Sequence, residues 1–370
     1  MRFEISKVLD AIEGRLCTDP ALARAVVDLG EVTRYVDLDG GRPATLLRLG
    51  IVVDALGRQV EEEGVPVYVV APRALASDQD LTSNERMVVR RWADDGLIEV
   101  LREPGDRVLE VADLLGLPVL SRSRFERMHD RYPWLGQPGR VLAPVTGSGG
   151  PALVAQVRGG RPAAAAEPSP AGQKLLSRIW HCPDPECGGY GAARTGRAGG
   201  QPPPTLRHGA PTCPRHDERL RDAGPRPRFE VLSVRVEGIV RQRFVVSDDH
   251  PVVVGRAPER GVMLGQWLTD EARRWISRNH VRFELRGPDL VVQDVSTNGT
   301  GLRPGGSNDD EQRLSLKQTG RALGPGDLVE LFPGVQVARS RTWSSGGVVN
   351  PVSVMAEAPT MAMRAVPPAR

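Results

Sequence analysis

The sequence predicts a multidomain chain with an N-terminal α/β domain, a small cysteine-containing module and a C-terminal all-β sandwich. Three observations lead to this prediction. Strand-like and helix-like segments alternate in the first third, three of the four cysteines lie together in the middle, and short strand-like runs separated by turn residues fill the last third. A chain of 370 residues is also longer than one typical domain.

The first part, residues 1–136, is expected to hold a parallel sheet covered by helices. Apolar runs of strand length alternate there with longer segments in which apolar residues recur every three or four positions. Such alternation is typical of βαβ units, whose parallel strands need a crossover connection. The strand-like runs are Ala23–Leu29, Val65–Val70, Leu97–Leu101 and Leu117–Ser121, and the helix-like segments are Ala44–Glu63, Asn84–Asp94 and Arg107–Leu115.

Two segments are predicted to be without stable structure. Residues 137–175 read as a flexible linker, because Gly, Pro and Ala dominate stretches such as 146–152 and 161–168. Residues 344–370 read as a disordered tail for the same reason. Segments of this composition bury too little apolar surface to offset the entropy lost on ordering.

Composition and charge exclude several classes of protein. The net charge of +3 is too small to indicate a nucleic-acid-binding protein by itself. No apolar run is long enough to cross a membrane, and the first residues lack the apolar core of a signal peptide, so we expect a soluble cytoplasmic protein without membrane partners. The excess of Arg over Lys and the many Ala, Gly and Pro residues are typical of a GC-rich bacterial genome.

A set of potential metal ligands lies in the middle of the chain. Cys182 and Cys187 form one pair, and Cys213 and His216 form a second pair after a 25-residue spacer. Thiolate and imidazole are the ligands that tetrahedral Zn²⁺ prefers. The pattern resembles a zinc ribbon over residues 176–222, which implies a structural zinc site of three cysteines and one histidine.

The alternative is that these are reduced cysteines in a linker. The spacer is rich in Gly and Pro and has almost no apolar core, so we expect it to be unfolded without metal. His181 and His208 are reserve candidates for the fourth ligand. A catalytic zinc site is not favoured, because no open coordination position is indicated.

The last third of the chain predicts a β-sandwich. Phe229–Val234 largely alternates apolar and polar residues, and six further short runs are separated by Gly, Pro and Asn turns. These runs are Arg243–Ser247, Val252–Gly255, His280–Leu285, Leu290–Val295, Leu328–Leu331 and Val335–Arg339. Four motifs follow one another within about 75 residues: Val254-Gly255-Arg256, Ser277-Arg278-Asn279-His280, Asp294–Thr300 and Leu323–Asp327. Together they resemble the forkhead-associated (FHA) domain, a β-sandwich that reads phosphothreonine, here over residues 228–343.

The resemblance implies a role for each matched residue. A phosphate needs a fixed cation, hydroxyl donors and backbone N–H groups on loops held by a rigid sheet. An arginine, a serine hydroxyl, a second arginine and a threonine would surround the phosphate, and an asparagine would hold the peptide backbone. The residues expected to bind the phosphopeptide are Arg256, Ser277, Arg278, Thr297 and Asn298.

Three further residues are expected to shape this site. Gly255 and Gly299 would occupy turns, and His280 would brace the loop that carries Ser277. The plain alternatives are ordinary surface charges for the two arginines and a common Asn-Gly hairpin turn.

A second resemblance concerns the N-terminal domain. Val26-Val27-Asp28 at a strand end and Asp106 at a helix start are similar to parts of the acidic site of PIN-like or NYN-like nucleases, which would bind Mg²⁺ or Mn²⁺. The chain departs from that pattern at Glu31, where Asn is common, and at Ser123, where Asp is expected. Three interpretations stay open: a degenerate PIN-like domain, an active nuclease and an unrelated α/β domain.

Asp28 and Asp106 also have plain interpretations, as a turn residue at a strand end and as a helix N-cap. We therefore predict an adaptor that binds a phosphothreonine segment of a partner protein, phosphorylated by a bacterial Ser/Thr kinase. The alternative is a metal-dependent ribonuclease recruited through its FHA domain. A third interpretation is a nucleic-acid scaffold in which Arg194, Arg197 and Arg207 of the ribbon contact phosphates, with strong salt dependence.

Overall fold

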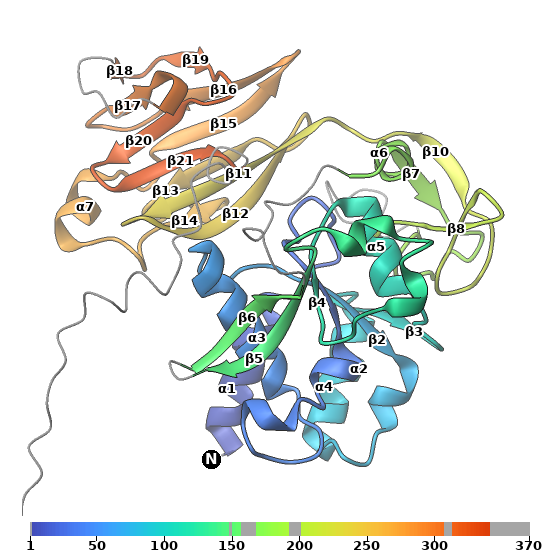
Figure 1. The fold of residues 1–370 in the computed structure, drawn as a ribbon. Coiled ribbons are helices and arrows are strands. Elements are labelled where there is room, and N and C mark those ends of the chain that lie inside the picture. The colour runs from blue at the N-terminus through green and yellow to red at the C-terminus, as the bar shows by residue number, and fades with distance from the viewer. Residues whose placement is uncertain (1, 148–149, 157–167, 192–200, 307–312, 341–370) are drawn as a thin grey trace, which may run out of the picture.

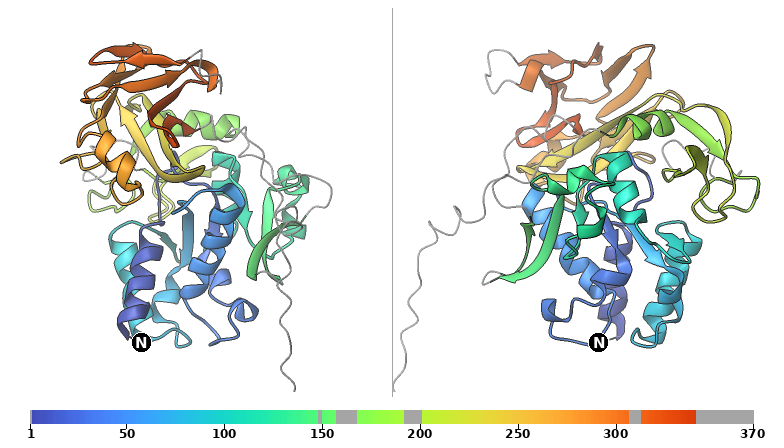
Figure 2. Two further views of the ribbon diagram at one scale, coloured as in Figure 1. Left: turned by 90° about the vertical axis from the view of Figure 1, so that its left-hand side faces the viewer. Right: turned by 45° about the vertical axis from the view of Figure 1, so that its right-hand side comes forward.

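The structure, a computed structural model, describes residues 2–147, 150–156, 168–191, 201–306 and 313–340. Three parts follow one another along the chain (Figure 1). An N-terminal part of helices and strands is followed by a small module of short strands and then by a two-sheet sandwich. The views in Figures 1 and 2 agree in placing the sandwich at one end of the N-terminal part.

The N-terminal part is built on a six-stranded sheet of order β3-β2-β1-β4-β5-β6. The first five strands of this order are parallel, and β6 is antiparallel to β5. Residues of β1 and β2 are buried on both faces, as in a sheet covered by helices on both sides. The strands are β1 (Val26–Asp28), β2 (Tyr68–Pro72), β3 (Glu99–Leu101), β4 (Val119–Leu120), β5 (Val141–Gly147) and β6 (Gly150–Ala155).

Helices cover the two faces of this sheet with separate apolar cores. Alternate strand residues point to opposite faces, so Val27 and Val69 pack in one core and Val26 and Val70 in the other. The first core includes residues of four helices, α1 to α4, and the second is formed mainly with α5. The helices are α1 (Arg2–Glu13), α2 (Leu29–Val32), α3 (Leu47–Val60), α4 (Ser83–Asp94) and α5 (Arg107–Leu115).

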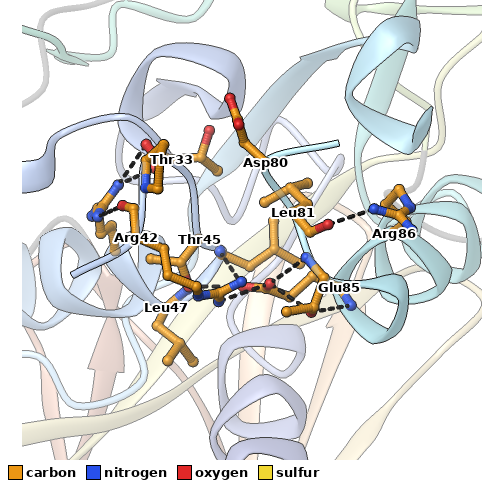
Figure 3. Close-up of polar contacts among 12 residues, drawn as sticks. Thr33, Arg42, Thr45, Leu47, Asp80, Leu81, Glu85 and Arg86 are labelled. Carbon is orange, nitrogen blue, oxygen red and sulfur yellow. Dashed lines mark hydrogen bonds and ion pairs between the residues drawn. The ribbon is translucent and has the colours of Figure 1, made fainter. Parts of the chain in front are cut away.

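A buried carboxylate fixes the start of α4. Glu85 accepts hydrogen bonds from the side chains of Thr45 and Thr82 at 2.7 Å each and from Arg42 at 2.9 Å (Figure 3). Burial raises its pKa, but hydrogen bonds from Thr82, Thr45 and the Leu46 N–H outweigh this effect, and the pKa is lowered overall. With its oxygens occupied in this way, Glu85 is a structural residue that joins α4 to the loop before α3.

The predicted linker at 137–175 is wrong over residues 141–147 and 150–155. These residues form β5 and β6, and Val141 and Leu142 are buried beside β4. Gly and Pro residues that favour a linker, such as Gly147, Gly150 and Pro151, lie next to the turn between the two strands. Apolar residues farther from the turn, such as Val141 and Leu142, complete the sheet. Residues Pro170–Leu176 form helix α6, capped by Ser169, and 157–167 lie outside the described residues.

The cysteine module consists of two small antiparallel sheets, β7 with β10 and β8 with β9. It extends to Pro225, slightly beyond the predicted boundary at 222. Its core contains apolar residues that the sequence prediction overlooked, namely Tyr190, Leu206 and Leu220. The strands are β7 (Arg178–His181), β8 (Thr205–Arg207), β9 (Ala210–Thr212) and β10 (Arg221–Pro225). Arg194 and Arg197 lie outside the described residues.

The C-terminal sandwich packs a six-stranded sheet, β12-β11-β21-β20-β17-β18, on a five-stranded sheet, β14-β13-β15-β16-β19. One apolar core lies between them. Its elements are β11 (Phe229–Val236), β12 (Ile239–Ser247), β13 (Val252–Gly255), β14 (Val262–Met263), α7 (Asp270–Trp275), β15 (Val281–Arg286), β16 (Asp289–Asp294), β17 (Thr300–Arg303), β18 (Leu314–Leu316), β19 (Gly320–Ala322), β20 (Leu328–Phe332) and β21 (Val335–Arg339).

The described part of the sandwich ends at Ser340, so the predicted domain end at 343 and the predicted disordered tail at 344–370 lie outside the described residues. Within the described chain, no helix has both the length and the apolar character needed to cross a membrane.

Candidate functional site

Three loops of the sandwich meet at one end of the strands of the five-stranded sheet. Because β13, β15 and β16 are antiparallel neighbours, the end of β13, the start of β15 and the end of β16 lie together. Gly255 closes β13 there, and a Cβ atom at this position would lie 2.0 Å from the carbonyl oxygen of Arg278. Only glycine allows the two loops to approach this closely.

Arg256 follows directly and is fixed through its backbone. Its N–H donates to the Ser277 carbonyl at 3.0 Å, and its own carbonyl accepts from Gly265 at the same distance. The side chain is half-buried, and its Nε is fully buried without a hydrogen-bond partner among the described residues. A buried, unpaired guanidinium donor is costly, so this side chain is suited to an anionic ligand.

Ser277 and Thr297 lie against each other across two loops. The backbone N–H of Thr297 donates to Ser277 Oγ at 3.1 Å, and the backbone N–H of Ser277 donates to His280 Nδ1 at 3.0 Å. His280 is fully buried, and burial lowers its pKa despite the nearby Asp294 charge. A neutral His280 is therefore the acceptor that holds the Ser277 loop in place.

Asn298 and Gly299 form the tip of the third loop. Asn298 is exposed, and its Nδ2 donates to the Trp275 carbonyl at 2.8 Å. Gly299 has a φ of 87°, which an L-residue rarely adopts. Arg278 is exposed beside this group, and its guanidinium has no ion pair among the described residues. The structure thus gathers all the predicted phosphopeptide-binding residues on neighbouring loops.

Asp294 is a site residue that the sequence prediction did not assign. Its Oδ1 accepts from Ser296 Oγ at 2.7 Å and from Thr300 Oγ1 at 2.6 Å, and its Oδ2 accepts from the Gln318 N–H at 2.8 Å. Burial raises its pKa, but these hydrogen bonds outweigh burial and lower it overall. The spacing of Asp, Ser and Thr in the motif was the available signal, because such side chains close turns on their own backbone.

The three cysteines and His216 converge in the middle module. Their ligand atoms all lie within 4.8 Å of one another, and no other such group of three or more His, Cys, Asp or Glu occurs in the described chain. Cys187 Sγ lies 3.7 Å from Cys213 Sγ, and His216 Nδ1 lies 3.4 Å from Cys182 Sγ. Zn–S bonds of about 2.3 Å in a tetrahedron place two sulfur atoms about 3.8 Å apart, so the cluster fits a metal of this kind.

Two further features suit a cation at this cluster. Asp184 Oδ2 lies 3.3 Å from His216 Nε2, the position from which a carboxylate orients a metal-bound histidine. The hydrogen bond from the Cys213 thiol lowers the pKa of Cys187 to about 5, which favours a thiolate at this position, whereas the pKa values of Cys182 and Cys213 are raised. His181 and His208, the reserve ligands, are exposed and do not belong to the cluster.

Asp28 caps a short helix. Its Oδ1 accepts from the Glu31 N–H at 3.1 Å, and burial raises its pKa. Glu31 accepts from Ser121 Oγ at 2.8 Å and from the Arg122 N–H at 3.1 Å, so it joins the carboxyl ends of β1 and β4. Ser123 donates its N–H to Ser121 Oγ at 2.9 Å. These contacts are those of a structural turn.

Asp106 occupies the N-cap position of α5, but its side chain makes no capping hydrogen bond. It accepts from the Tyr132 hydroxyl at 2.9 Å and pairs with Arg131 instead, so the N-cap interpretation is wrong for its side chain. Asp28 and Asp106 have different partners. In the described chain neither belongs to a group of three metal-ligand side chains, and the structure does not bring together the acidic site that the second resemblance implies.

Comparisons with known proteins give no family match and no match among curated proteins. Among solved structures, the FHA domain of human APLF in complex with an XRCC1 bisphospho peptide is 26% identical, with 30% of this chain and 95% of that chain covered, at a TM-score of 0.22. The MEK1 FHA domain is 25% identical over 29% and 85% of the two chains, with a TM-score of 0.23. The FHA domain of CT664 from Chlamydia trachomatis is 18% identical over 30% and 93%, with a TM-score of 0.22. Similarity at this level assigns the chain to no family.

Proposed function

We propose that the C-terminal sandwich binds a phosphothreonine segment of a partner protein and that the chain is an adaptor in Ser/Thr kinase signalling, in a bacterium. The observation that carries the proposal is the buried, unpaired Nε of Arg256 between two loops. Arginine offers phosphate a fork of N–H donors whose geometry matches its oxygens. The motif resemblance to FHA domains assigns the same role to this residue.

The neighbouring groups complete a phosphate site. Ser277 Oγ already accepts one hydrogen bond from the Thr297 N–H, which leaves its own proton available for a phosphate oxygen. Arg278 adds a second positive charge, and recognition of a phosphorylated motif by clustered arginines is a recurring mode of peptide binding. Asn298 is exposed at the loop tip, where it would contact the peptide backbone.

Binding of the full chain to a degenerate phosphothreonine peptide library tests this proposal, with unphosphorylated and phosphoserine libraries as references. Wild-type protein is expected to retain phosphothreonine peptides selectively. Arg256→Ala is expected to weaken binding by about tenfold to a hundredfold, because a charge-assisted hydrogen bond to a desolvated phosphate is lost. Retained affinity in Arg256→Ala would contradict the assignment of the site.

Arg321 provides a matched control. It is an exposed arginine on β19 of the same sandwich, and it has no ion pair among the described residues. Arg321→Ala removes the same charge outside the loops, so its phosphopeptide affinity is expected to equal that of the wild type. A similar loss in both variants would show that only bulk charge matters.

The cysteine cluster supports a structural role for zinc in this adaptor. Zn²⁺ would be held by Cys182, Cys187, Cys213 and His216. The fold of the cysteine module would depend on the bound ion. Since these four side chains would fill all positions of a tetrahedron, no open position would be available for catalysis. We propose no nuclease activity, because the described acidic residues do not form a cluster in the N-terminal sheet.

A further inference from the structure

A cavity of about 560 Å³ lies between the N-terminal sheet and the cysteine module. Arg73 and Arg102 reach it from the residues that follow β2 and β3, which are adjacent parallel strands. Arg215 reaches it from the other side, out of the segment between the metal-ligand candidates Cys213 and His216. Arg73 and Arg102 place the cavity beyond the carboxyl ends of β2 and β3.

The cavity, called here the arginine pocket, has an excess of positive charge. Its charged lining residues are six arginines and four carboxylates, and 6 − 4 gives a local net charge of +2. The whole chain of 370 residues carries only +3, so this excess is concentrated. The arginines that line the pocket are Arg73, Arg102, Arg107, Arg131, Arg207 and Arg215.

Three of these arginines have carboxylate partners and three do not. Arg107 pairs with Glu110 at 2.8 Å, Arg207 pairs with Asp217 at 3.4 Å, and Arg131 pairs with Asp106. Within the described chain, the guanidinium groups of the other three make no hydrogen bond or ion pair: Arg73, Arg102 and Arg215. The remaining carboxylate of the lining, Glu103, is exposed and pairs with none of them among the described residues.

We propose that the arginine pocket binds a small phosphate monoester. Guanidinium forks match the oxygens of a phosphate group, and a phosphate monoester carries a charge of about −1.5 to −2 at neutral pH, close to the excess of the pocket. The volume is that of a small-molecule site. The pocket lining has no aromatic residue on which bases of a single-stranded nucleic acid would stack.

The second wall of the pocket depends on the cysteine module being folded onto the sheet. Arg107 is buried and donates to the Pro204 carbonyl at 3.4 Å, and Glu110 accepts from the Leu206 N–H at 2.9 Å and from Thr205. These contacts hold β8 beside α5. Arg215 is therefore presented to the pocket by the same short segment that carries two metal ligands.

The test is a calorimetric titration of the full chain with ribose 5-phosphate. It is carried out in the Arg256→Ala variant, which lacks the proposed phosphopeptide site. Saturable binding of one equivalent is expected, and unphosphorylated ribose is expected not to bind. The double variant Arg73→Ala/Arg102→Ala is expected to lose at least about tenfold in affinity, since two charge-assisted contacts are removed. Arg321→Ala is the matched charge control and is expected to bind as well as its parent.

Thermal unfolding of each variant shows whether the fold is retained. The Arg215→Ala variant tests the opposite wall of the pocket, and its metal content is measured to show that the cysteine module is intact. Three outcomes would overturn the proposal: no saturable binding, binding unchanged in the double variant, or binding of a short single-stranded RNA while ribose 5-phosphate does not bind. The last outcome would identify a nucleic-acid surface. None of these outcomes affects the phosphothreonine site, because that site is measured with peptides in the wild-type sandwich.

Discussion

Glu62, in the loop between α3 and β2, accepts two hydrogen bonds from the guanidinium group of Arg243 on β12, at 2.6 and 2.9 Å. Both side chains are buried, and the residues are 181 positions apart in the sequence. Around this pair, Val240 donates its N–H to Glu61 at 3.0 Å and accepts from the Glu63 N–H at 2.8 Å. The loop thus extends the sandwich at its β12 edge and joins it to the N-terminal domain.

Removal of Glu62 is expected to destabilise this junction strongly. Arg24 also lies 3.3 Å from Glu62, and burial followed by the Arg243 charge lowers the pKa of Arg24 to about 10. Glu62→Ala leaves two poorly solvated guanidinium groups without their carboxylate, a change that costs about 3–5 kcal/mol. We expect a clear fall in the unfolding midpoint of the full chain and faster proteolysis between the two domains.

Glu63→Ala is the matched control for that experiment. The Glu63 carboxylate is half exposed and pairs with Arg241, which lies on β12 like Arg243. Surface pairs of this kind contribute about 1 kcal/mol or less. If Glu62→Ala changes the midpoint no more than Glu63→Ala does, the buried pair does not join the domains in solution.

Loss of the Asp294 carboxylate is expected to loosen the phosphate-binding loop. Asp294→Ala leaves the buried Ser296 and Thr300 hydroxyls and the Gln318 N–H without their acceptor. Unpaired buried polar groups cost about 1–3 kcal/mol each, so both stability and phosphothreonine-peptide affinity should fall. Chemical denaturation and peptide titration measure the two effects. Asp289→Ala, at the exposed start of the same strand, is expected to change neither.

The sequence was most informative where local pattern and tertiary structure agree. Val252–Gly255 and Val335–Arg339 form strands with the predicted bounds, because the first run ends at a glycine and the second begins directly after the Pro333-Gly334 turn. The hairpin of β5 and β6 was not predicted, since its Gly and Pro residues resemble a linker until β4 is beside it. Contacts such as Glu62 with Arg243 depend on segments far apart in the chain, and no local pattern indicates them.

The same limit applies to the candidate sites. The four metal-ligand candidates could be predicted from their spacing, because ligand pairs on short turns are local features. The contacts of Asp294 with Ser296 and Thr300 could have been predicted from their spacing, but its hydrogen bond from Gln318, 24 positions later, could not. Asp106 was expected to cap α5, but Tyr132 and Arg131 compete for its carboxylate from another loop.

Metal removal is expected to unfold the cysteine module. One equivalent of zinc per chain should be measured by atomic absorption in protein purified without chelator. Cys187→Ser is expected to abolish this content and to expose residues 178–225 to protease, because the small core around the cluster is insufficient alone. Cys17→Ser is the control, since Cys17 lies outside the cluster, and its zinc content should be unchanged. Full zinc content in Cys187→Ser would contradict the ligand assignment.

The buried His280 is expected to make the sandwich less stable in mild acid. Burial lowers its pKa in the folded state below the ordinary value of 6.5, so between the two values the unfolded chain binds more protons than the folded chain. Its contribution is therefore fully present above pH 6.5 and is lost as the pH falls below 6.5 toward the lower folded pKa. The slope in that window is at most about 1.4 kcal/mol per pH unit. Protonation would also remove the acceptor for the Ser277 N–H.

Denaturant unfolding between pH 7.5 and pH 5 (about the range in which histidine titrates) measures this effect, with the wild type compared to His280→Gln. The glutamine variant is expected to be less stable at every pH but to lack the additional loss below pH 6.5. His250→Gln, a substitution at an exposed position of the same sandwich, should retain the wild-type slope. Stability is the better observable than peptide affinity here, because the phosphate group itself titrates near pH 6 and would mask the histidine. An identical slope in wild type and His280→Gln would show that His280 does not provide the acid sensitivity.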